Sequence, residues 1–396
     1  MTLTTDNRLW IEAVARDTGF DLAGLAPVPD PDSQAVRRDD ESFAAWIDAG
    51  AAGEMEWLKR TDAAGAYVRG DLRRSMPWAR SVLVCAVNYN AAAPLSIDPA
   101  PADRGWIARY AWSGRGGAAM APENSEGSDY HEELLPKLQA IADTLQDSFG
   151  SACKTKAYVD TGPILERGYA ARAGIGWIGR NTCVLNQAQG SWLLLGVVVT
   201  SLELELEAAP TVAADRCGTC TRCIDACPTD ALHGSGLDGS DRRMDASRCI
   251  AYLTIEKKGS IAPELREGMG RQVFGCDICQ DVCPWNRRAP VGHSGMLQPR
   301  AELVNSPLAW LASLDGPNFK RKFRGSPLER TRRKRILRNV AIAMGNSGEE
   351  QFRPQLLAWA QDPADHVLAE AAGWALGRLA LSKKPTAETD LSSPPQ

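Results

Sequence analysis

Eight cysteines in two motifs constrain this chain of 396 residues more than any other feature of its sequence. The motifs are Cys217-x2-Cys220-x2-Cys223-x3-Cys227-Pro228 and Cys276-x2-Cys279-x3-Cys283-Pro284, with Cys249 upstream of the second. In the first spacing, a short loop directs three thiolates to one [4Fe–4S] cluster, and the fourth cysteine points to a second cluster. The sequence therefore predicts two clusters in a ferredoxin-like domain of the bacterial type.

The interleaved motifs also predict which cysteines share a cluster. We assign cluster 1 to Cys217, Cys220, Cys223 and Cys283, and cluster 2 to Cys227, Cys249, Cys276 and Cys279. The alternative is a pair of four-cysteine zinc sites, but such sites usually pair two CxxC motifs across a longer spacer. Of the other cysteines, Cys85 lies in an apolar segment typical of a core, and no role is predicted for Cys153 or Cys183.

The overall composition, with 44% hydrophobic and 24% charged residues, is typical of a soluble globular protein of two or three domains. The first residues lack a basic segment followed by an apolar stretch, and the chain has no run of 18 apolar residues. We therefore expect a cytoplasmic monomer without membrane contact. In that compartment, clustered cysteines bind metal more often than they form disulfides.

Residues 1–208 alternate helix-like and strand-like segments, which predicts an α/β layer fold. Apolar residues at helical spacing predict helices over Arg8–Thr18 and His131–Phe149. Ser81–Val87 and Leu193–Thr200 are short and apolar, as buried strands are. This first part is the expected cofactor-binding and catalytic domain.

The remainder of the chain divides into three parts by composition. The ferredoxin-like part spans 209–300, a purely helical pattern spans 301–382, and a polar tail over 383–396 is expected to be disordered. In the helical part, Ala343-Met344-Gly345 and Ala375-Leu376-Gly377 match at an offset of 32 residues. This match predicts two paired-helix repeats of the HEAT type, which would pack on the preceding domain because two repeats alone are marginally stable.

A GxGxxG string, Gly174-Ile-Gly-Trp-Ile-Gly179, raises the alternative of a dinucleotide-binding site. That fingerprint follows a strand and opens a helix. Here a helix-like segment, Leu165–Ala173, precedes the string and a strand-like segment, Thr182–Leu185, follows it. The glycines are instead expected to allow the backbone to approach a ligand closely.

A basic segment opens the helical part of the chain. From Lys320 to Arg338 there are ten Lys or Arg against one acidic residue, whereas the rest of the chain has 35 basic and 48 acidic residues. Such a cluster can neutralise nucleic-acid phosphates, although charge runs also occur on ordinary solvated faces. On a helix from about residue 328, an apolar stripe would pack inward and three arginines would share an outer face. The stripe is Ile336, Val340 and Met344, and the arginines are Arg332, Arg335 and Arg338.

Several strings together resemble the signature of epoxyqueuosine reductases. They are Asp129-Tyr-His131, Asp160-Thr-Gly-Pro-Ile-Leu-Glu-Arg167, Ala173-Gly-Ile-Gly-Trp-Ile-Gly-Arg-Asn-Thr182, Cys249-Ile-Ala-Tyr-Leu-Thr254, Gly275-Cys-Asp-Ile-Cys-Gln280, Cys283-Pro-Trp-Asn286, Phe323-Arg-Gly-Ser-Pro-Leu328 and Ile336-Leu-Arg-Asn339. The resemblance covers nearly the whole chain in order. It departs from the family at a longer glycine-rich insertion between Tyr110 and Asp129, where Ser113–Gly127 is expected to form a surface loop.

The resemblance implies a cobalamin-dependent reductase with a cobalamin domain, a two-cluster domain and HEAT-like helices. It implies removal of the epoxide oxygen of epoxyqueuosine, at the wobble position of a tRNA anticodon, to give queuosine. It places Tyr110 and His131 near the cofactor. Because no DxHxxG string occurs, we expect base-off cobalamin without a histidine lower ligand. An external low-potential donor, flavodoxin or ferredoxin-like, would supply the electrons.

Reduction of an epoxide to an alkene needs a positioned acid, because the oxygen is a poor leaving group until it is protonated. We predict that Asp160 is this acid, as the resemblance also implies, and that shielding by corrin and substrate keeps it protonated. Its alternative role is to cap a helix that starts near Pro163. Arg167, expected two helical turns further on the same face, would contact corrin amides, orient the acid or remain solvated. Asp277, between two cluster ligands, would bridge cluster and corrin or turn its loop.

Three functions are compatible with these features. The favoured one is a reductase acting on tRNA, with RNA contacts from Lys257, Lys258, Arg324, Arg332, Arg335 and Arg338. A corrinoid reductive dehalogenase combines the same cofactors, but those enzymes are typically exported and have no need of a basic segment. A non-catalytic electron-transfer module would leave both the Asp160 string and the basic segment unexplained.

Overall fold

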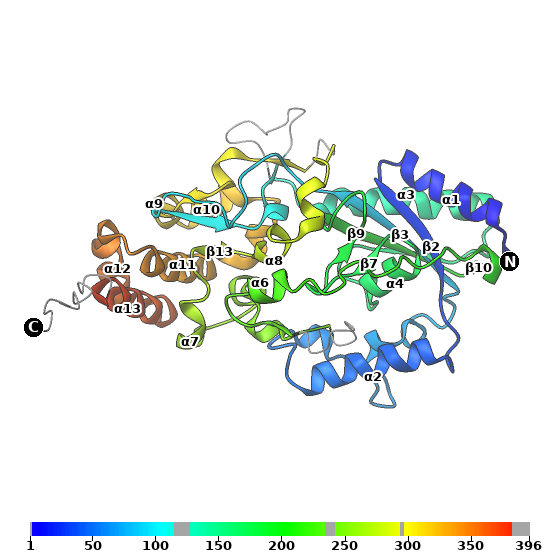
Figure 1. Cartoon of the computed structure of the whole chain (residues 1–396), viewed down its shortest axis with the longest axis horizontal. Coiled ribbons are helices and arrows are strands. Elements are labelled where there is room, and N and C mark those ends of the chain that lie inside the picture. Colours follow the sequence, from blue (N-terminus) through cyan, green and yellow to red (C-terminus); the bar gives the residue numbers. More distant parts are fainter. Residues whose placement is uncertain (1, 115–126, 234–241, 294–296, 382–396) are drawn as a thin grey trace, which may run out of the picture.

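The computed structural model describes residues 2–114, 127–233, 242–293 and 297–381. A sheet with its helices lies at the N-terminal end of an elongated molecule, and the C-terminal helices lie at the other end (Figure 1). The predicted glycine-rich loop falls largely on residues 115–126, and the predicted tail on 383–396. Both lie outside the described residues.

A four-stranded antiparallel sheet forms the N-terminal part, in the order β2-β3-β9-β6. Its strands are β2 (Leu22–Pro27), β3 (Ser81–Asn88), β6 (Thr155–Tyr158) and β9 (Leu193–Thr200). β3 and β9 pair along their full length, from Ser81 with Thr200 to Asn88 with Leu193. Both strands were predicted from their apolar composition, and they form the central pair of the sheet, where β3 is buried at every position.

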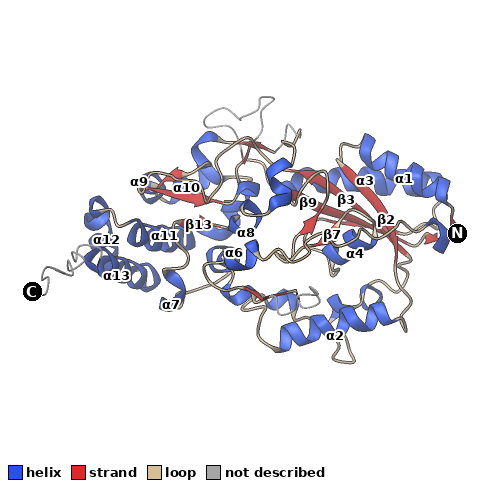
Figure 2. Cartoon of the chain, in the orientation of Figure 1, coloured by secondary structure: helices blue, strands red, loops and turns tan. Residues whose placement is uncertain are grey.

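Helices cover both faces of this sheet, which confirms the predicted layers (Figure 2). α1 (Thr5–Asp17) and α3 (Tyr130–Phe149) pack on one face, close to their predicted bounds, and α4 (Glu166–Arg172) packs on the other. Side chains of a strand alternate between its faces. In β3, Leu83, Cys85 and Val87 join the core with α1 and α3, and Val82, Val84 and Ala86 join the core with α4.

The cysteine motifs lie on short elements between the two ends of the molecule. These elements are α5 (Arg222–Asp225), β11 (Leu232–His233), β12 (Arg243–Met244), α6 (Ile250–Ile255), α7 (Pro263–Arg266) and α8 (Ile278–Asp281). α5 and α8 each contain one motif cysteine, Cys223 and Cys279, and the two helices contact each other. The two motifs are therefore adjacent in space although they are far apart in the chain.

A second small sheet joins segments from all three predicted parts of the chain. Its order is β13-β4-β15, with β13 (Gln272–Phe274), β4 (Arg104–Ile107) and β15 (Ser306–Pro307). β4 pairs with β13 in parallel and with β15 antiparallel. One apolar core extends from Ile107 and Trp112 through α6 to the C-terminal helices. The cluster region and the helical part therefore share a core.

Within the described part of 301–381, the long elements are helices. They are α9 (Leu308–Ser313), α10 (Gly316–Phe323), α11 (Pro327–Ser347), α12 (Arg353–Ala360) and α13 (His366–Leu381). The two matching triplets face each other, because a Cβ added to Gly345 of α11 would lie 2.7 Å from Cα of Ala375 of α13. The helical character of this part is confirmed, and its HEAT-type repeats remain a prediction.

Short strand pairs complete the described fold. β1 (Thr2–Leu3) pairs with β10 (Glu203–Leu204), β5 (Ser113–Gly114) with β14 (Gln298–Pro299), and β7 (Trp177–Ile178) with β8 (Val184–Leu185). α2 (Gln34–Asp48) lies below the sheet in Figure 1, and its Trp46 donates a hydrogen bond to the carbonyl of Met244 at 2.7 Å. None of the helices described here combines the length and apolar character that a bilayer span requires.

The arginines of α11 do not share the predicted outer face. The apolar stripe of α11 is buried as expected, but Arg338 is buried too, with 1% of its surface exposed. Its guanidinium donates to the carbonyls of Leu253, Lys257 and Gly259 at 2.6, 2.8 and 2.6 Å. Burial, together with the charge of Arg335, lowers the pKa of Arg338 to about 10.

The other two arginines of the predicted face also differ from each other. Arg335 is half-buried and donates to the carbonyl of Ile255 at 2.6 Å. Arg332 is exposed and has a φ of 64° and ψ of 148°, where α11 bends. The bend breaks the three-residue spacing, so the prediction of one outer face for all three arginines is wrong.

Arg338→Ala is expected to destabilise the protein strongly. The substitution removes the buried guanidinium and leaves three carbonyl oxygens, of which that of Leu253 is buried, without their charged donor, a loss of about 3 kcal/mol or more. Arg324→Ala, at an exposed arginine nearby, serves as the matched control and should change stability by less than about 0.5 kcal/mol. Thermal unfolding of the cluster-loaded proteins measures both effects, and equal melting temperatures for the two variants would contradict the structural role of Arg338.

Candidate active site and cluster-binding residues

The motif cysteines form two spatial groups in the structure. The thiol of Cys223 has those of Cys283, Cys217 and Cys220 as its charged neighbours. The second group centres on Cys276, whose neighbours include Cys249 and Cys227. Cys279 lies close to Cys183, Cys276 and Cys249, and also to Cys223 of the first group. This grouping matches the predicted exchange of ligands between the motifs, and all eight thiols are free of disulfides.

A cavity of about 280 Å³ lies at the first group of cysteines. Its lining includes Cys217, Cys220, Cys223 and Cys283, with Arg180, Arg216 and Arg222 among its other residues. The indole N–H of Trp177 donates to Sγ of Cys217 at 3.4 Å. Free thiols around a cavity next to N–H donors fit a cluster, whose sulfur atoms accept such hydrogen bonds.

The second group of cysteines lies next to the other candidate residues. Asp277, between Cys276 and Cys279, is 6% exposed, and its Oδ2 accepts a hydrogen bond from the backbone N–H of Arg109 at 2.6 Å. Arg109 directly precedes Tyr110 in a short 3-10 helix, Arg109–Ala111. Asp277 therefore connects the cluster loop to the segment that carries Tyr110.

The zinc alternative receives no support from the arrangement of the side chains. A Zn–S distance of about 2.3 Å would bring four thiolates to within roughly 4 Å of one another. In the part of the chain that the structure describes, no three His, Cys, Asp or Glu side chains are grouped to hold a single ion. Ligands of a cubane cluster bind separate iron corners and are spaced more widely.

The GxGxxG string follows α4 and includes β7, the first strand of the β7–β8 hairpin, so it has neither the preceding strand nor the following helix that a dinucleotide site requires. Its glycines were expected to face a ligand, but they face the chain itself. A Cβ on Gly176 would lie 2.0 Å from the carbonyl oxygen of Leu185, and a Cβ on Gly179 would lie 2.5 Å from the Leu185 side chain. These glycines allow the hairpin to close.

Asp160 lies in the loop between β6 and α4 and is exposed. α4 begins only at Glu166 and its cap position is Leu165, so the alternative role of Asp160 as a helix cap is wrong. The backbone of Asp160 has a φ of 54°, in the left-handed region that favours glycine. Strain of this kind is often found at functional sites.

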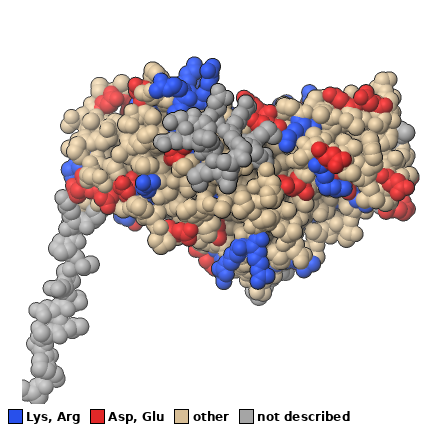
Figure 3. All heavy atoms as spheres, turned by 90° about the horizontal axis from the view of Figure 1, so that it is seen from above, with Lys and Arg blue, Asp and Glu red and all other residues tan. Residues whose placement is uncertain are grey.

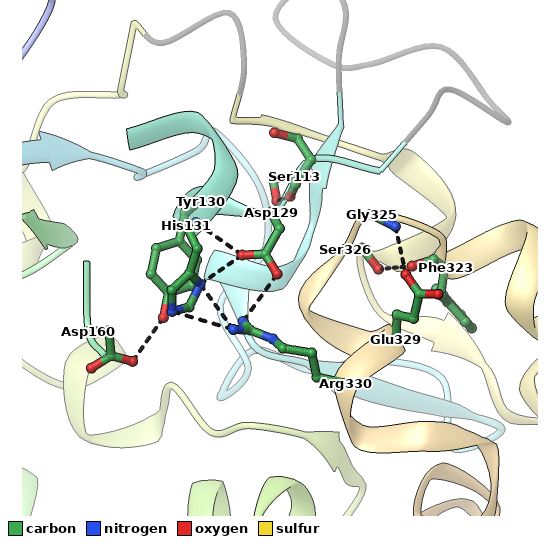
Figure 4. Close-up of polar contacts among 11 residues, drawn as sticks. Ser113, Asp129, Tyr130, His131, Asp160, Phe323, Gly325, Ser326, Glu329 and Arg330 are labelled. Atoms are coloured by element: carbon green, nitrogen blue, oxygen red, sulfur yellow. Dashed lines mark hydrogen bonds and ion pairs between the residues drawn. The ribbon is translucent and has the colours of Figure 1, made fainter. Parts of the chain in front are cut away.

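Tyr130 fixes the carboxyl group of Asp160. Its hydroxyl donates to Oδ2 of Asp160 at 3.0 Å (Figure 4). Burial and the nearby charge of Asp160 raise the pKa of Tyr130, so the phenol stays protonated and remains a donor. Tyr110 packs edge-on against Tyr130, with 6.0 Å between the ring centroids, and also against Phe274. Tyr110 and Asp160, which were predicted separately, are thus joined through Tyr130, which was noted in the sequence only as part of the Asp129-Tyr-His131 string.

His131 belongs to a charged group next to Tyr130. Its Nδ1 lies 2.8 Å from Oδ1 of Asp129. Arg330 of α11 reaches the same pair, with Nη2 3.2 Å from Oδ2 of Asp129 and Nη1 3.0 Å from Nδ1 of His131. No site role was predicted for Asp129 or Arg330, and their contact was not predicted, because the two residues are 201 positions apart in the sequence.

Arg167 does not orient Asp160 in this structure. It is the second residue of α4, whereas Asp160 lies in the preceding loop, so the predicted two-turn spacing on one helix face is wrong. Its guanidinium donates to the carbonyl oxygen of Thr182 at 2.6 Å and to Oγ1 of Thr182 at 3.1 Å. Next to it, burial raises the pKa of Glu166 to about 7 although Arg69 is close by.

The predicted RNA contacts differ in how accessible they are. Arg324, Arg332 and Lys258 are exposed. Lys257 forms an ion pair with Glu54, whose carboxylate also accepts the backbone N–H of Lys258 at 2.9 Å. Burial opposes ionisation of Glu54, but its hydrogen bonds and the lysine charges together lower its pKa. Among the predicted contacts, the exposed side chains are the ones that a polyanion can reach directly.

Together, the cluster-binding groups and the adjoining acid define an iron–sulfur oxidoreductase. The family model for the 4Fe-4S double cluster binding domain matches residues 216–286, and the model "Epoxyqueuosine reductase QueG, DUF1730" matches residues 69–161. A curated epoxyqueuosine reductase of Xanthomonas campestris is 33% identical over 384 residues, covering 95% of this chain and 97% of the relative. The chain belongs to the epoxyqueuosine reductase family, which confirms the resemblance found in the sequence and the two [4Fe–4S] clusters.

Solved structures agree with this assignment. A crystal structure of epoxyqueuosine reductase with a tRNA-Tyr epoxyqueuosine-modified tRNA stem loop has a TM-score of 0.77 at 26% identity, covering 94% of this chain and 90% of that one. The epoxyqueuosine reductase of Bacillus subtilis, with an aspartate catalytic loop swung out of the active site, has a TM-score of 0.75 at 26% identity. That match covers 97% of this chain and 96% of the other.

Pairs of cysteine substitutions test the exchange of ligands between motifs. Anaerobic wild-type protein should contain about eight irons per chain, four in each cubane cluster. Cys220→Ala combined with Cys283→Ala should retain about four, because both thiols serve cluster 1. Cys220→Ala combined with Cys276→Ala should lose nearly all of the iron. Iron analysis with EPR of the reduced proteins distinguishes the cases, and near-complete loss in the first pair would show that Cys283 serves the other cluster.

Proposed function

We propose that this chain reduces the epoxide of epoxyqueuosine, at the wobble position of tRNA, to queuosine, and that Asp160 donates a proton to the departing oxygen. The main support is the strained, exposed Asp160, fixed by Tyr130 beside the tyrosine that adjoins the cluster loop. The reaction breaks both C–O bonds, forms a C=C bond and releases water, and it consumes two electrons and two protons. One of these protons is assigned to Asp160.

Cobalamin is the proposed electron-accepting cofactor, and the residues near Asp160 suit it. When bound, it supplies a strongly nucleophilic, low-valent cobalt that can react with the epoxide. Tyr110, His131, Asp160, Arg167 and Asp277 are the residues proposed to hold it. Both ring nitrogens of His131 lie within 3.4 Å of Arg330, and Nδ1 also contacts Asp129. Because both ring nitrogens of His131 lie against these side chains, His131 is not proposed as a lower ligand of the cobalt. This supports base-off binding of cobalamin without a histidine lower ligand.

The clusters would deliver electrons in a fixed order. Cluster 2 adjoins Tyr110 through the Asp277–Arg109 hydrogen bond, so it is the proposed immediate donor to the active site. Cluster 1 borders the open cavity, where Arg216 and Arg222 are exposed, so it would receive electrons from outside. Exposed arginines suit an acidic, low-potential partner such as a flavodoxin or a ferredoxin-like protein.

The tRNA would bind the exposed part of the basic segment. Arg324 and Arg332 are exposed there, and Lys258 is exposed next to the Cys249 string. On the face seen in Figure 3, Lys and Arg side chains form separate patches with acidic side chains between them. This mixed surface supports contact at a limited number of phosphates. We further propose that the C-terminal helices form HEAT-like repeats and that the protein acts as a cytoplasmic monomer.

Asp160→Asn is expected to abolish epoxide reduction in cells. In a strain lacking the gene, nucleosides from tRNA should show accumulated epoxyqueuosine, which the wild-type gene clears and the variant does not. Mass spectrometry of the nucleosides measures the outcome, and the iron content of the variant should equal that of wild type. Unchanged queuosine in the deletion strain would refute the proposed function, and full clearance by the variant would remove Asp160 from it.

Charge reversal at the exposed arginines is expected to weaken tRNA binding. Arg324→Glu with Arg332→Glu should lower the affinity at least about tenfold at physiological salt and reduce its salt dependence, because two phosphate contacts are lost. Fluorescence anisotropy with a labelled anticodon stem loop measures the affinity. Arg37→Glu, at an exposed arginine of α2, is the matched control and should leave the affinity unchanged. Equal affinity for the double variant and wild type would place the RNA elsewhere.

A further inference from the structure

We propose that Arg330 is a positioning residue of the active site. In this proposal, it fixes Asp129, His131 and Tyr130 so that Tyr130 restrains the loop that carries Asp160. We call these five residues the Arg330 cluster. The inference rests on the proposed role of Asp160, and it adds a residue of the C-terminal helices to the machinery around that acid.

Arg330 contacts three members of the cluster at once (Figure 4). Its Nη2 lies 3.2 Å from Oδ2 of Asp129, its Nη1 lies 3.0 Å from Nδ1 of His131, and its guanidinium carbon lies 5.9 Å from the centroid of the Tyr130 ring. The rings of Tyr130 and His131 pack together, with 4.0 Å between centroids. The arginine therefore covers the side of the cluster that faces the C-terminal helices, while the Tyr130 hydroxyl on the other side reaches Asp160.

The charge of Arg330 balances a carboxylate that is largely out of water. The side chain of Asp129 is 10% exposed, whereas that of Arg330 is 50% exposed. Burial opposes ionisation of Asp129, but the hydrogen bonds from His131 and the charge of Arg330 together lower its pKa, so this carboxylate is ionised at neutral pH. Without Arg330, the buried carboxylate of Asp129 loses its cationic partner, and we expect the His131–Asp129 pair to rearrange.

The backbone around Arg330 is fixed against the start of α3. A Cβ added to Gly127 would lie 2.8 Å from the carbonyl oxygen of Arg324, so residues 127 and 324 are in close contact. Glu329 accepts the backbone N–H of Gly325 at 2.9 Å, which closes the turn before Arg330. Two residues after Arg330, the bend at Arg332 separates this first part of α11 from the buried remainder. Because of this bend, the direction of Arg330 toward α3 does not depend on the axis of the rest of α11.

The loop that carries Asp160 depends on this arrangement. Asp160 is exposed, has a positive φ, and receives its hydrogen bond from Tyr130 within the described residues. Tyr130 is the first residue of α3, where Asp129 is the cap and accepts the backbone N–H of His131 at 3.0 Å. A shift of Asp129 therefore moves the helix start that carries Tyr130. Arg330 acts on the acid through these two residues and does not touch it.

Single-turnover kinetics with saturating epoxyqueuosine tRNA tests this role. Arg330→Gln should slow epoxide reduction at least about tenfold while changing the affinity for tRNA less than about threefold, because a displaced acid affects the reaction and not the binding. Arg330→Lys keeps the charge and should recover part of the rate. Arg37→Ala, on an exposed part of α2, is the matched control and should react like wild type. A weaker affinity with an unchanged rate would make Arg330 an RNA contact only and overturn the proposal.

Hydrogen exchange of the tRNA-free protein provides a readout that is independent of activity. Amides of residues 159–165 should exchange at least about threefold faster in Arg330→Gln and in Tyr130→Phe, and the double variant should exchange no faster than either single variant. Unchanged exchange in Arg330→Gln with intact iron content would refute the positioning role. If wild type failed to reduce epoxyqueuosine, the proposed function would be wrong, yet the exchange data would still decide whether Arg330 restrains the loop.

Discussion

The backbone pairing of the three-stranded sheet β13-β4-β15 is the interaction on which the rest of the structure depends, because each of its strands leads to a different part of the molecule. β13 leads into the second cysteine motif, β4 into the segment of Tyr110, and β15 into the C-terminal helices. The backbone N–H of Ala108 donates to the carbonyl of Phe274 at 2.7 Å, and that of Trp106 to Arg271 at 2.8 Å. Backbone pairing therefore fixes where the cluster loop lies relative to the active-site tyrosine.

Two further features keep the cluster loop close to the segment that carries Tyr110. Gly275 has a φ of 67°, and a Cβ there would lie 2.5 Å from Cβ of Ala108, so only glycine allows the cluster loop to pass so close to β4. Two residues later, Asp277 accepts the backbone N–H of Arg109. An electron donor and the site it serves gain from a short, rigid separation, and here the separation is set by backbone contacts and one buried carboxylate.

The sequence predicted those parts of the molecule that depend on local pattern. Cysteine spacing predicted the two groups of thiols that the structure brings together, and apolar runs located β3, β9, α1 and α3 to within a few residues. The errors came where tertiary contacts override local pattern. Asp160 was compatible with a helix cap until the structure showed that α4 starts six residues later, and the glycines of the GxGxxG string close a hairpin instead of facing a ligand. The Asp129–Arg330 contact has no local signal at all.

The basic segment shows why a count of charges overestimates a binding surface. α6 begins directly after its cap residue Cys249, a predicted cluster ligand, and ends at Ile255, where its last carbonyl groups lack partners within the helix. Arg338 and Arg335 donate to carbonyls in the last turn of this helix, at Leu253 and Ile255, so their charges also face the negative end of the helix dipole. A row of carbonyl oxygens and a row of phosphate oxygens both attract guanidinium groups. The segment is therefore divided: the buried Arg338 and the half-buried Arg335 hold the helix that follows Cys249, Arg330 lies against Asp129 and His131, and only the exposed remainder is available to a polyanion.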